Sequence, residues 1–153
     1  MFHDALVPFA ERRIIKMKED CIFCKLANGI FDTNTLYEDE EFRVIFDASP
    51  ATEGHVLILP KEHYANVFEL PEETASKIYV LAKKIATVLK EVTGCDGVNI
   101  LQNNGEAAGQ TVFHLHMHII PRYKDGEDII KWNPGEANQS GIDKIIEKAK
   151  TML

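Results

Sequence analysis

Histidine occupies every second position of residues 114–118, where it alternates with Leu115 and Met117. Successive side chains along a strand point to opposite faces of a sheet. A strand over 112–120 therefore places the apolar residues in the core and the imidazoles in a row on the other face. Polar strand faces normally use threonine, lysine or glutamate, so the row indicates a site for chemistry. A solvated face and a metal-only cluster are the alternatives. The row consists of His114, His116 and His118.

Neighbouring imidazoles suit chemistry at phosphorus. A neutral imidazole is a good nucleophile, and its ordinary pKa of about 6.5 leaves it mostly uncharged at pH 7. A second imidazole beside it can carry a proton to a leaving group. Attack on phosphorus gives a phosphohistidine-type intermediate that water can hydrolyse. Such a reaction also needs hydrogen-bond donors for the non-bridging phosphate oxygens.

The segment before the histidines offers such donors. It supplies a side-chain amide, flexible backbone N–H groups and a hydroxyl within a few residues. A glycine-containing loop alone is usually only a turn, whereas Gly-Gln-Thr directly before a row of imidazoles favours a phosphate site. The residues concerned are Asn103, Gly105, Gly109, Gln110 and Thr111.

Two of the three cysteines, Cys21 and Cys24, form a C-x₂-C pair. Two thiolates at this spacing can hold one zinc ion, but redox pairs and chance produce the same spacing. The sequence has no second pair, so further zinc ligands would come from distant positions. No thioredoxin-like βαβ pattern surrounds the pair, which weakens the redox interpretation. Zinc binding and plain packing stay open, and Cys95 is expected to pack.

The hydrophobic pattern around these residues predicts an α+β domain. Strand, strand, long helix, strand, strand is the expected order, and the short loop between the last two strands requires an antiparallel pair. The helices are expected to pack against this antiparallel sheet. The predicted elements are a short helix over 22–27, strands over 42–46, 55–59, 98–102 and 112–120, and helices over 71–92 and from Ser140 onwards.

Both long helices carry regular apolar positions. Pro71 suits the first position of the long helix because its missing N–H would be unpaired there, and Gly94 ends the helix. Ser140 with Asp143 is a helix-start signal for the last helix. Apolar residues three or four positions apart predict one buried face on each helix. They are Ile78, Leu81, Ile85, Leu89 and Val92 in the long helix, and Ile142, Ile145, Ile146, Ala149 and Leu153 in the last.

Composition narrows the class of protein. The chain has 153 residues, of which 17 are basic and 24 acidic, for a net charge of −7. This balance argues against a nucleic-acid-binding surface, and no apolar run reaches the roughly 18 residues of a membrane helix. Three cysteines fit a reducing cytoplasm. We expect an N-terminal extension over 1–16 and a single cytoplasmic domain over 17–153, with neither nucleic acid nor membrane as partner.

Residues 114–120 fit the pattern His-φ-His-φ-His-φ-φ, where φ is apolar, and here the sequence resembles the histidine triad (HIT) family of nucleotide-binding hydrolases and transferases. The likeness extends from about Cys21 to Trp132. The resemblance implies a HIT-like fold, with an antiparallel sheet of about five strands, a long helix and a C-terminal helix, and with two sheets joined across a homodimer. Supporting motifs are Tyr37-Glu38-Asp39, Phe46-Asp47, residues 54–61, Asn103-Asn104-Gly105 and Gly109-Gln110-Thr111.

The resemblance also implies roles for individual residues. His116 would attack the α-phosphorus of a purine nucleotide derivative, and His118 would contact the scissile bridging oxygen. Asp47 would accept hydrogen bonds from the ribose hydroxyls, and His55 would join the network behind the site. The phosphate and leaving group would be held by Asn103, Gly109 and Thr111, and the purine by Ile22, Phe23 and Phe46. The alternative to a binding role is that Asp47 is only a turn residue at the end of a strand, and that the apolar residues only pack in the core.

Branches of the family differ at informative positions. Asn103 favours a Hint-like purine nucleoside phosphoramidate hydrolase that releases AMP or GMP and needs no catalytic metal. Gln110-Thr111 and Pro121-Arg122 look as much like Fhit-like dinucleoside polyphosphate hydrolases, which are the first alternative. His118 argues against the uridylyltransferase branch, which has glutamine there. A nucleotide-binding regulatory module with incidental hydrolysis is the second alternative.

A structural zinc site is also implied by the resemblance. Some members of the family hold zinc with two cysteines, a histidine after the Pro-Lys turn and the first triad histidine. All four residue types are present here, as Cys21, Cys24, His63 and His114. Zinc bound there would make His114 a ligand rather than a catalyst and would pin one end of the active-site strand.

Overall fold

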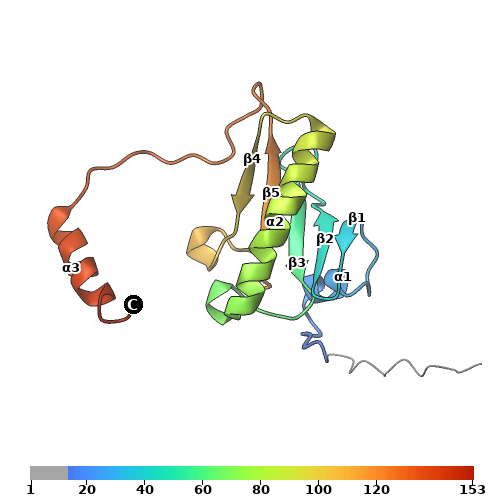
Figure 1. Cartoon of the computed structure of the whole chain (residues 1–153), viewed down its shortest axis with the longest axis horizontal. Coiled ribbons are helices and arrows are strands. Elements are labelled where there is room, and N and C mark those ends of the chain that lie inside the picture. The colour runs from blue at the N-terminus through green and yellow to red at the C-terminus, as the bar shows by residue number, and fades with distance from the viewer. Residues whose placement is uncertain (1–13) are drawn as a thin grey trace, which may run out of the picture.

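The computed structural model describes residues 14–153, so residues 1–13 of the expected extension over 1–16 lie outside the described residues. It contains a five-stranded sheet in the order β1-β2-β3-β5-β4, with α2 crossing one face (Figure 1). Every neighbouring pair of strands is antiparallel. This is the expected α+β architecture. The elements are α1 Ile22–Ala27, β1 Thr35–Glu38, β2 Phe42–Phe46, β3 Val56–Pro60, α2 Glu72–Thr93, β4 Gly97–Leu101, β5 Met117–Arg122 and α3 Gln139–Ala149, with short 3-10 turns at Val67–Glu69 and Glu106–Ala108.

The main core lies between α2 and the sheet. Four of the five predicted core positions of α2 are buried, but Val92 is 73% exposed. The prediction for Val92 was wrong because 22 helical residues span about 33 Å, whereas strands of five or six residues span only about 17–20 Å. The last turn of α2 therefore extends past the sheet. The core joins Ile78, Leu81, Ile85 and Leu89 to Val44, Val56, Ile58, Leu115, Met117 and Ile119.

The ends of α2 follow simple capping chemistry. Pro71 has an extended backbone and precedes the helix as its N-cap, so the helix begins one residue later than expected. Glu72 and Glu73 lie in the first turn, where the helix dipole favours negative charge. Gly94 ends the helix in a left-handed conformation, with φ of 67°, and donates its N–H to the Lys90 carbonyl. Of the described helices, none combines the length and apolar composition needed to cross a bilayer.

The histidine segment is a strand over only part of the predicted range of 112–120. β5 begins at Met117. The residues before it bend over 112–114 and are anchored by a 2.6 Å hydrogen bond from the Leu115 N–H to the Tyr64 carbonyl. The sequence pattern predicts the alternation of side chains but not where ladder partners are available. In β5 the partners begin where Met117 pairs with Ile58 of β3.

Pro121 lies inside β5 and does not end it, contrary to expectation. The Thr52 hydroxyl donates to the Pro121 carbonyl at 2.6 Å. In a strand, the nitrogen and carbonyl of one residue point to the same side. The missing N–H of Pro121 therefore faces the residues before β3 begins, where no ladder partner is needed.

Two further elements depart from the sequence-based expectations. β1 was not predicted, because it is a four-residue edge strand with little buried apolar surface. α3 was expected to pack against the sheet, but it stands apart at the end of an extended segment, with no buried residue (Figure 1). Its N-cap is Asn138, not Ser140, and the Asn138 side chain accepts the Gly141 N–H.

Candidate active site

The three triad histidines lie on the polar side of the β5 segment, and the residues between them enter the core. His114 is fully buried, His116 is 8% exposed and His118 is half-buried. The rings of His116 and His118 lie edge to face, with their centroids 5.0 Å apart. The row is therefore not a solvated face. It divides into His114 at one end and the adjacent pair of His116 and His118 at the other.

The backbone fixes the tautomer of His116. Its Nδ1 lies 2.7 Å from the carbonyl oxygen of His114. A carbonyl only accepts hydrogen bonds, so Nδ1 carries the hydrogen and Nε2 keeps its lone pair. Burial lowers the pKa of His116, against the opposing effects of the His114 carbonyl and Asp47. His116 is thus a neutral imidazole whose Nε2 can act as a nucleophile or a hydrogen-bond acceptor.

A second imidazole and a carboxylate lie behind His118. His55 Nε2 is 2.8 Å from His118 Nδ1 and 3.5 Å from an Asp47 carboxylate oxygen. The other Asp47 oxygen accepts the Ser49 N–H. Burial, with smaller effects from His116 and His55, lowers the pKa of His118 to about 4. Burial also lowers the pKa of His55, so both imidazoles are uncharged at pH 7.

The short helix α1 brings apolar residues beside the imidazoles. The ring of Phe23 meets that of His116 edge-on, with centroids 4.9 Å apart. Ile22 is 44% exposed and Phe46 is 39% exposed, so both present apolar surface to solvent. The structure brings Phe23 to the triad and leaves the side chains of Ile22 and Phe46 partly exposed.

The predicted phosphate-binding residues lie on the connection from β4 to the histidine segment. Asn103 follows two residues after Leu101, which is the register partner of His118. Gly109 adopts a left-handed φ of 88°, and a Cβ there would lie 3.5 Å from the Asn103 amide. Among the described residues, Asn103, Gly109 and Thr111 form no hydrogen bond with a triad imidazole. Thr111 is exposed.

Gln110 holds this connection together and does not offer its amide to a ligand. Its side chain is 2% exposed. Its oxygen accepts the Gly105 N–H at 2.8 Å, and its nitrogen donates to the carbonyls of Ala65 and Val112. The sequence pattern suggested Gln110 as a free donor, but burial makes it a support of the loop. No periodicity or charge pattern in the sequence signals this role.

The four predicted metal ligands converge at the other end of the triad. One ligand atom from each of the four lies within 4.8 Å of all the others. His114 Nδ1 is 3.5 Å from Cys21 Sγ and 3.4 Å from Cys24 Sγ, and His63 Nδ1 is 3.3 Å from Cys24 Sγ. Two thiols and two imidazoles at these separations form a donor set typical of structural zinc.

The surroundings of this cluster favour a cation. His114 Nε2 is 2.9 Å from the Pro60 carbonyl, so Nε2 carries the hydrogen and the Nδ1 lone pair faces the thiols. Backbone N–H groups of Lys18 and Cys24 donate to the sulfurs of Cys24 and Cys21. Burial raises the pKa of the Cys24 thiol to about 11. The thiolate form is therefore stable here only beside a positive ion.

The HIT domain family model matches residues 28–125 of the chain, a range that contains the triad and the motifs around it. The chain belongs to the HIT family. Adenosine 5'-monophosphoramidase HNT1 of Candida albicans is a relative with 37% identity over 139 residues, which cover 87% of this chain and 91% of that protein. The resemblance seen in the sequence is thereby confirmed.

Solved structures share the fold of this HIT domain. The crystal structure of SMU.412c from Streptococcus mutans has a TM-score of 0.83 and 38% identity, and the match covers 89% of this chain and 87% of that one. A zinc-bound histidine triad family protein from Mycobacterium smegmatis has a TM-score of 0.68 and 33% identity, with 88% and 98% covered.

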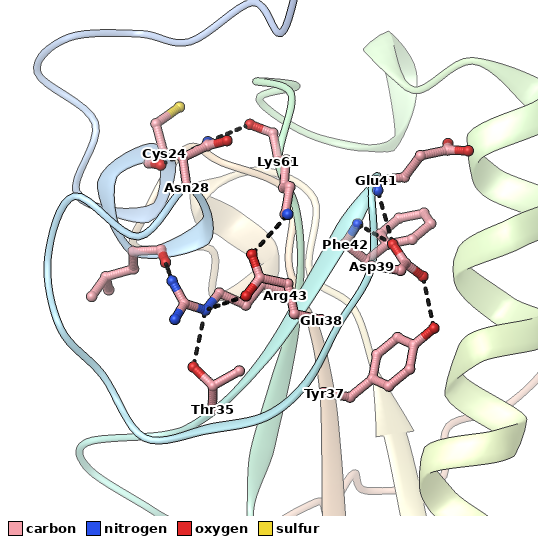
Figure 2. A network of polar contacts seen from close by, with 11 residues as sticks. Cys24, Asn28, Thr35, Tyr37, Glu38, Asp39, Glu41, Phe42, Arg43 and Lys61 are labelled. Atoms are coloured by element: carbon pink, nitrogen blue, oxygen red, sulfur yellow. Dashed lines mark hydrogen bonds and ion pairs between the residues drawn. The ribbon is translucent and has the colours of Figure 1, made fainter. Parts of the chain in front are cut away.

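In this HIT domain, α1 carries Cys24 of the thiol cluster and Phe23 beside His116, yet it has only six residues. A helix this short is unstable alone. Its C-cap residue, Asn28, donates its side-chain N–H groups to the carbonyls of Cys24 and Lys61 at 2.9 and 2.8 Å (Figure 2). Asn28 thus joins the end of α1 to the chain just after β3, two residues before His63.

Arg43 of β2 closes a second link to α1. Its guanidinium donates to the Leu26 carbonyl at 3.0 Å and to the Thr35 hydroxyl at 2.9 Å. Glu38 of β1 lies between two cations, 2.8 Å from Lys61 Nζ and 3.8 Å from Arg43 Nε (Figure 2). We call the four side chains of Asn28, Glu38, Arg43 and Lys61 the α1 clasp. The sequence pattern does not predict the α1 clasp, since its members are far apart in the chain.

Proposed function

We propose that the protein is a nucleotide hydrolase that acts on the α-phosphate of purine nucleoside phosphoramidates. The observation that carries the proposal is the neutral His116, whose Nδ1 hydrogen is held by the His114 carbonyl and whose Nε2 lone pair is left for attack. The adjacent imidazole of His118 and the apolar surface of α1 complete a site for a nucleotide. Similarity to a protein named as an adenosine 5'-monophosphoramidase supports the substrate class.

The proposed reaction has two steps. His116 Nε2 attacks the α-phosphorus, a nitrogen–phosphorus bond forms to the enzyme, and the bond to the leaving amine breaks. Water then attacks the nucleotidyl-histidine, which restores His116 and releases AMP or GMP. His118 contacts the leaving atom in the first step. Both steps use imidazoles and hydrogen-bond donors, and neither calls for a catalytic metal.

The remaining predicted residues would bind the nucleotide. Asp47 would accept hydrogen bonds from the ribose hydroxyls. Asp47 is half-buried beside His55, so its carboxylate is held in position and a ligand can still contact it. The phosphate and leaving group would meet the loop of Asn103, Gly109 and Thr111. The purine would be covered by Ile22, Phe23 and Phe46.

Zinc would be bound by Cys21, Cys24, His63 and His114. Their donor set fits a structural site with four protein ligands and no open position. Zinc would supply the positive charge that keeps buried thiolates stable. His114 would then serve as a ligand through its ring while its carbonyl orients His116. The similar zinc-bound protein from Mycobacterium smegmatis supports a metal in this family.

The protein would act as a homodimer in the cytoplasm. α3 has eleven residues and none of them is buried, although Ile142, Ile145 and Ile146 recur on one side. A helix of this length is marginal in water unless an apolar face is covered. A second copy of the chain is the partner that the family resemblance implies.

The proposal is tested by a comparison of two substrates at equal enzyme concentration. Adenosine phosphoramidate is expected to turn over faster than a diadenosine polyphosphate, and acid-free denaturation during turnover is expected to trap AMP on His116. Faster turnover of the diadenosine compound would favour the dinucleoside polyphosphate hydrolase. Very slow turnover of both, with tight AMP binding, would favour a nucleotide-binding regulatory module.

A further inference from the structure

A chain of hydrogen bonds behind His118 begins at the backbone. The Ala51 N–H donates to His55 Nδ1 at 3.0 Å. A backbone N–H can only donate, so His55 Nδ1 must present a lone pair. His55 is 5% exposed, and burial lowers its pKa, so the ring is neutral at pH 7. Its one remaining hydrogen is therefore on Nε2.

The position of that hydrogen decides the tautomer of His118. His55 Nε2 lies 2.8 Å from His118 Nδ1, and the Asp47 oxygen is farther away at 3.5 Å. The Nε2 hydrogen of His55 is therefore donated to His118 Nδ1, which must also present a lone pair. A neutral His118 then carries its hydrogen on Nε2. The relay runs from Ala51 through His55 to His118.

We propose that His55 is a positioning residue that holds His118 in the tautomer with its only hydrogen on Nε2, so that His118 is a fixed hydrogen-bond donor to the departing atom. The part of this inference that names the departing atom as the acceptor rests on the proposed hydrolase function. The position of the hydrogen itself rests only on the relay geometry.

The relay limits what His118 can do. Full loss of the Nε2 hydrogen would leave a buried imidazolate, because Nδ1 receives only a hydrogen bond. A shift of the His55 hydrogen to His118 would merely move the imidazolate to His55, where the Ala51 N–H supplies no second proton. His118 therefore shares its hydrogen with the leaving nitrogen and keeps it. The departing amine takes its proton from a water molecule, and the hydroxide that remains is consumed when the nucleotidyl-histidine is hydrolysed in the second step.

The relay also explains why only one of the two histidine-containing clusters suits a metal ion. Asp47, His55 and His118 also place three ligand atoms within 4.8 Å of one another, close enough for a metal. The hydrogen between His55 and His118 occupies the space and the lone pair that a metal would need. In the thiol cluster, the Pro60 carbonyl holds the His114 hydrogen on Nε2 and frees Nδ1. The Pro60 carbonyl thus leaves a lone pair for a cation in the thiol cluster, whereas the Ala51 N–H places a hydrogen between His55 and His118.

Nitrogen-15 NMR of the full chain labelled at histidine tests the tautomer directly. Long-range proton–nitrogen correlations distinguish a hydrogen on Nδ1 from one on Nε2, and the His118 signals are assigned by their loss in His118→Gln. We expect His118 to be the Nε2–H tautomer and His55 likewise at pH 7. A Nδ1–H tautomer of His118, or a mixture of both, overturns the inference even if the protein hydrolyses phosphoramidates.

Variants at His55 test the consequence for catalysis. His55→Gln keeps an N–H donor towards His118 Nδ1, whereas His55→Leu removes it. We expect His55→Leu to lower kcat on the order of tenfold or more, with KM changed by no more than about twofold, and to leave His118 as a mixture of tautomers. His55→Gln should restore the Nε2–H tautomer and most of kcat. Equal losses in both variants would overturn the positioning role.

A leaving-group series separates this role from general loosening of the fold. Adenosine 5'-phosphate esters of phenols with graded acidity place a different charge on the departing oxygen. In His55→Leu the rate should depend more steeply on phenol acidity than in the parent, because poor leaving groups lose the fixed donor. Thr52→Val, which removes the nearby bond to the Pro121 carbonyl, is the matched control and should leave the dependence unchanged. An unchanged slope in His55→Leu would count against the proposal.

Discussion

The ring of Phe23 lies edge-on to the ring of His116, with their centroids 4.9 Å apart and their planes at 84°. The same Phe23 ring also lies edge-on to His114, at 6.1 Å. One side chain of a six-residue helix thus lies against both His114 at the thiol end of the triad and His116 next to it. The position of α1 therefore affects both the thiol cluster and the surroundings of His116. Because a six-residue helix is unstable alone, this position depends on the hydrogen bonds of the α1 clasp.

Loss of the α1 clasp should weaken nucleotide binding from a distance. Arg43→Met removes the bonds to Leu26 and Thr35 while keeping most of the buried volume. We expect KM for adenosine phosphoramidate to rise about three- to tenfold, with kcat changed less, since one or two hydrogen bonds contribute about 1 kcal/mol each. The measurement is steady-state kinetics together with AMP titration.

Lys77→Met is the matched control for this variant. Lys77 also pairs with carboxylates, those of Glu41 and Glu73, but from the second turn of α2, on its exposed side. It should change neither KM nor kcat. A kcat loss in Arg43→Met with KM unchanged would mean that the α1 clasp does not act through the nucleotide pocket.

Removal of the proposed nucleophile should separate chemistry from binding. His116→Ala is expected to lower kcat on the order of 10⁴-fold or more, because the neighbouring His55 carries its hydrogen on Nε2 and therefore offers no Nε2 lone pair for attack. AMP should still bind within about threefold of the parent affinity, since truncation to alanine leaves Asp47 and the apolar side chains of α1 in place. Single-turnover kinetics and calorimetric titration measure the two quantities. Turnover that survives the substitution would rule out the covalent route.

The metal cluster predicts a specific stoichiometry. Purified protein should contain about one zinc ion per chain, and Cys24→Ser should lower the zinc affinity more than the roughly 100-fold typical of a lost supporting contact. Cys95→Ala removes a buried thiol that belongs to neither cluster and should leave the zinc content unchanged. Elemental analysis and competition with a chelator provide the readout. An undiminished zinc content in Cys24→Ser would show that other residues bind the metal.

The sequence predicted which residues come together better than it predicted the contacts that support them. Alternation at 114–118 was enough to separate the core residues from the imidazoles, because the period of a strand is independent of its partners. The tautomers of His116 and His118 could not be predicted, since they depend on the carbonyl of His114 and the N–H of Ala51. Val92 shows the same limit in the fold: a helical period predicts a face but not the length of sheet available to cover it.

Stability should fall in acid, partly because of His118. Its pKa is about 4 in the folded chain, against an ordinary 6.5, so the unfolded chain takes up the proton first. The contribution of His118 to the free energy of unfolding should therefore decrease as the pH falls through the interval from about 6.5 to about 4 and level off below it. His118→Gln should show a shallower dependence over this interval. Urea unfolding at several pH values measures the slopes, and identical slopes would mean that His118 is protonated equally in both states.

The C-terminal segment should hold two copies of the chain together through α3. If α3 packs on a second copy, the full chain should sediment with the mass of two 17.3 kDa chains. Removal of residues 124–153 deletes the extended segment and α3 but leaves every strand of the sheet, so the truncated chain should fold and dissociate more readily on dilution. Ile145→Glu places a charge on the apolar side of the helix, where Ile145 is 68% exposed, and should act in the same direction. Lys144→Glu, on the adjacent polar side, is the matched control. A monomeric full chain, or a dimer equally stable in all four proteins, would show that α3 does not hold two copies together.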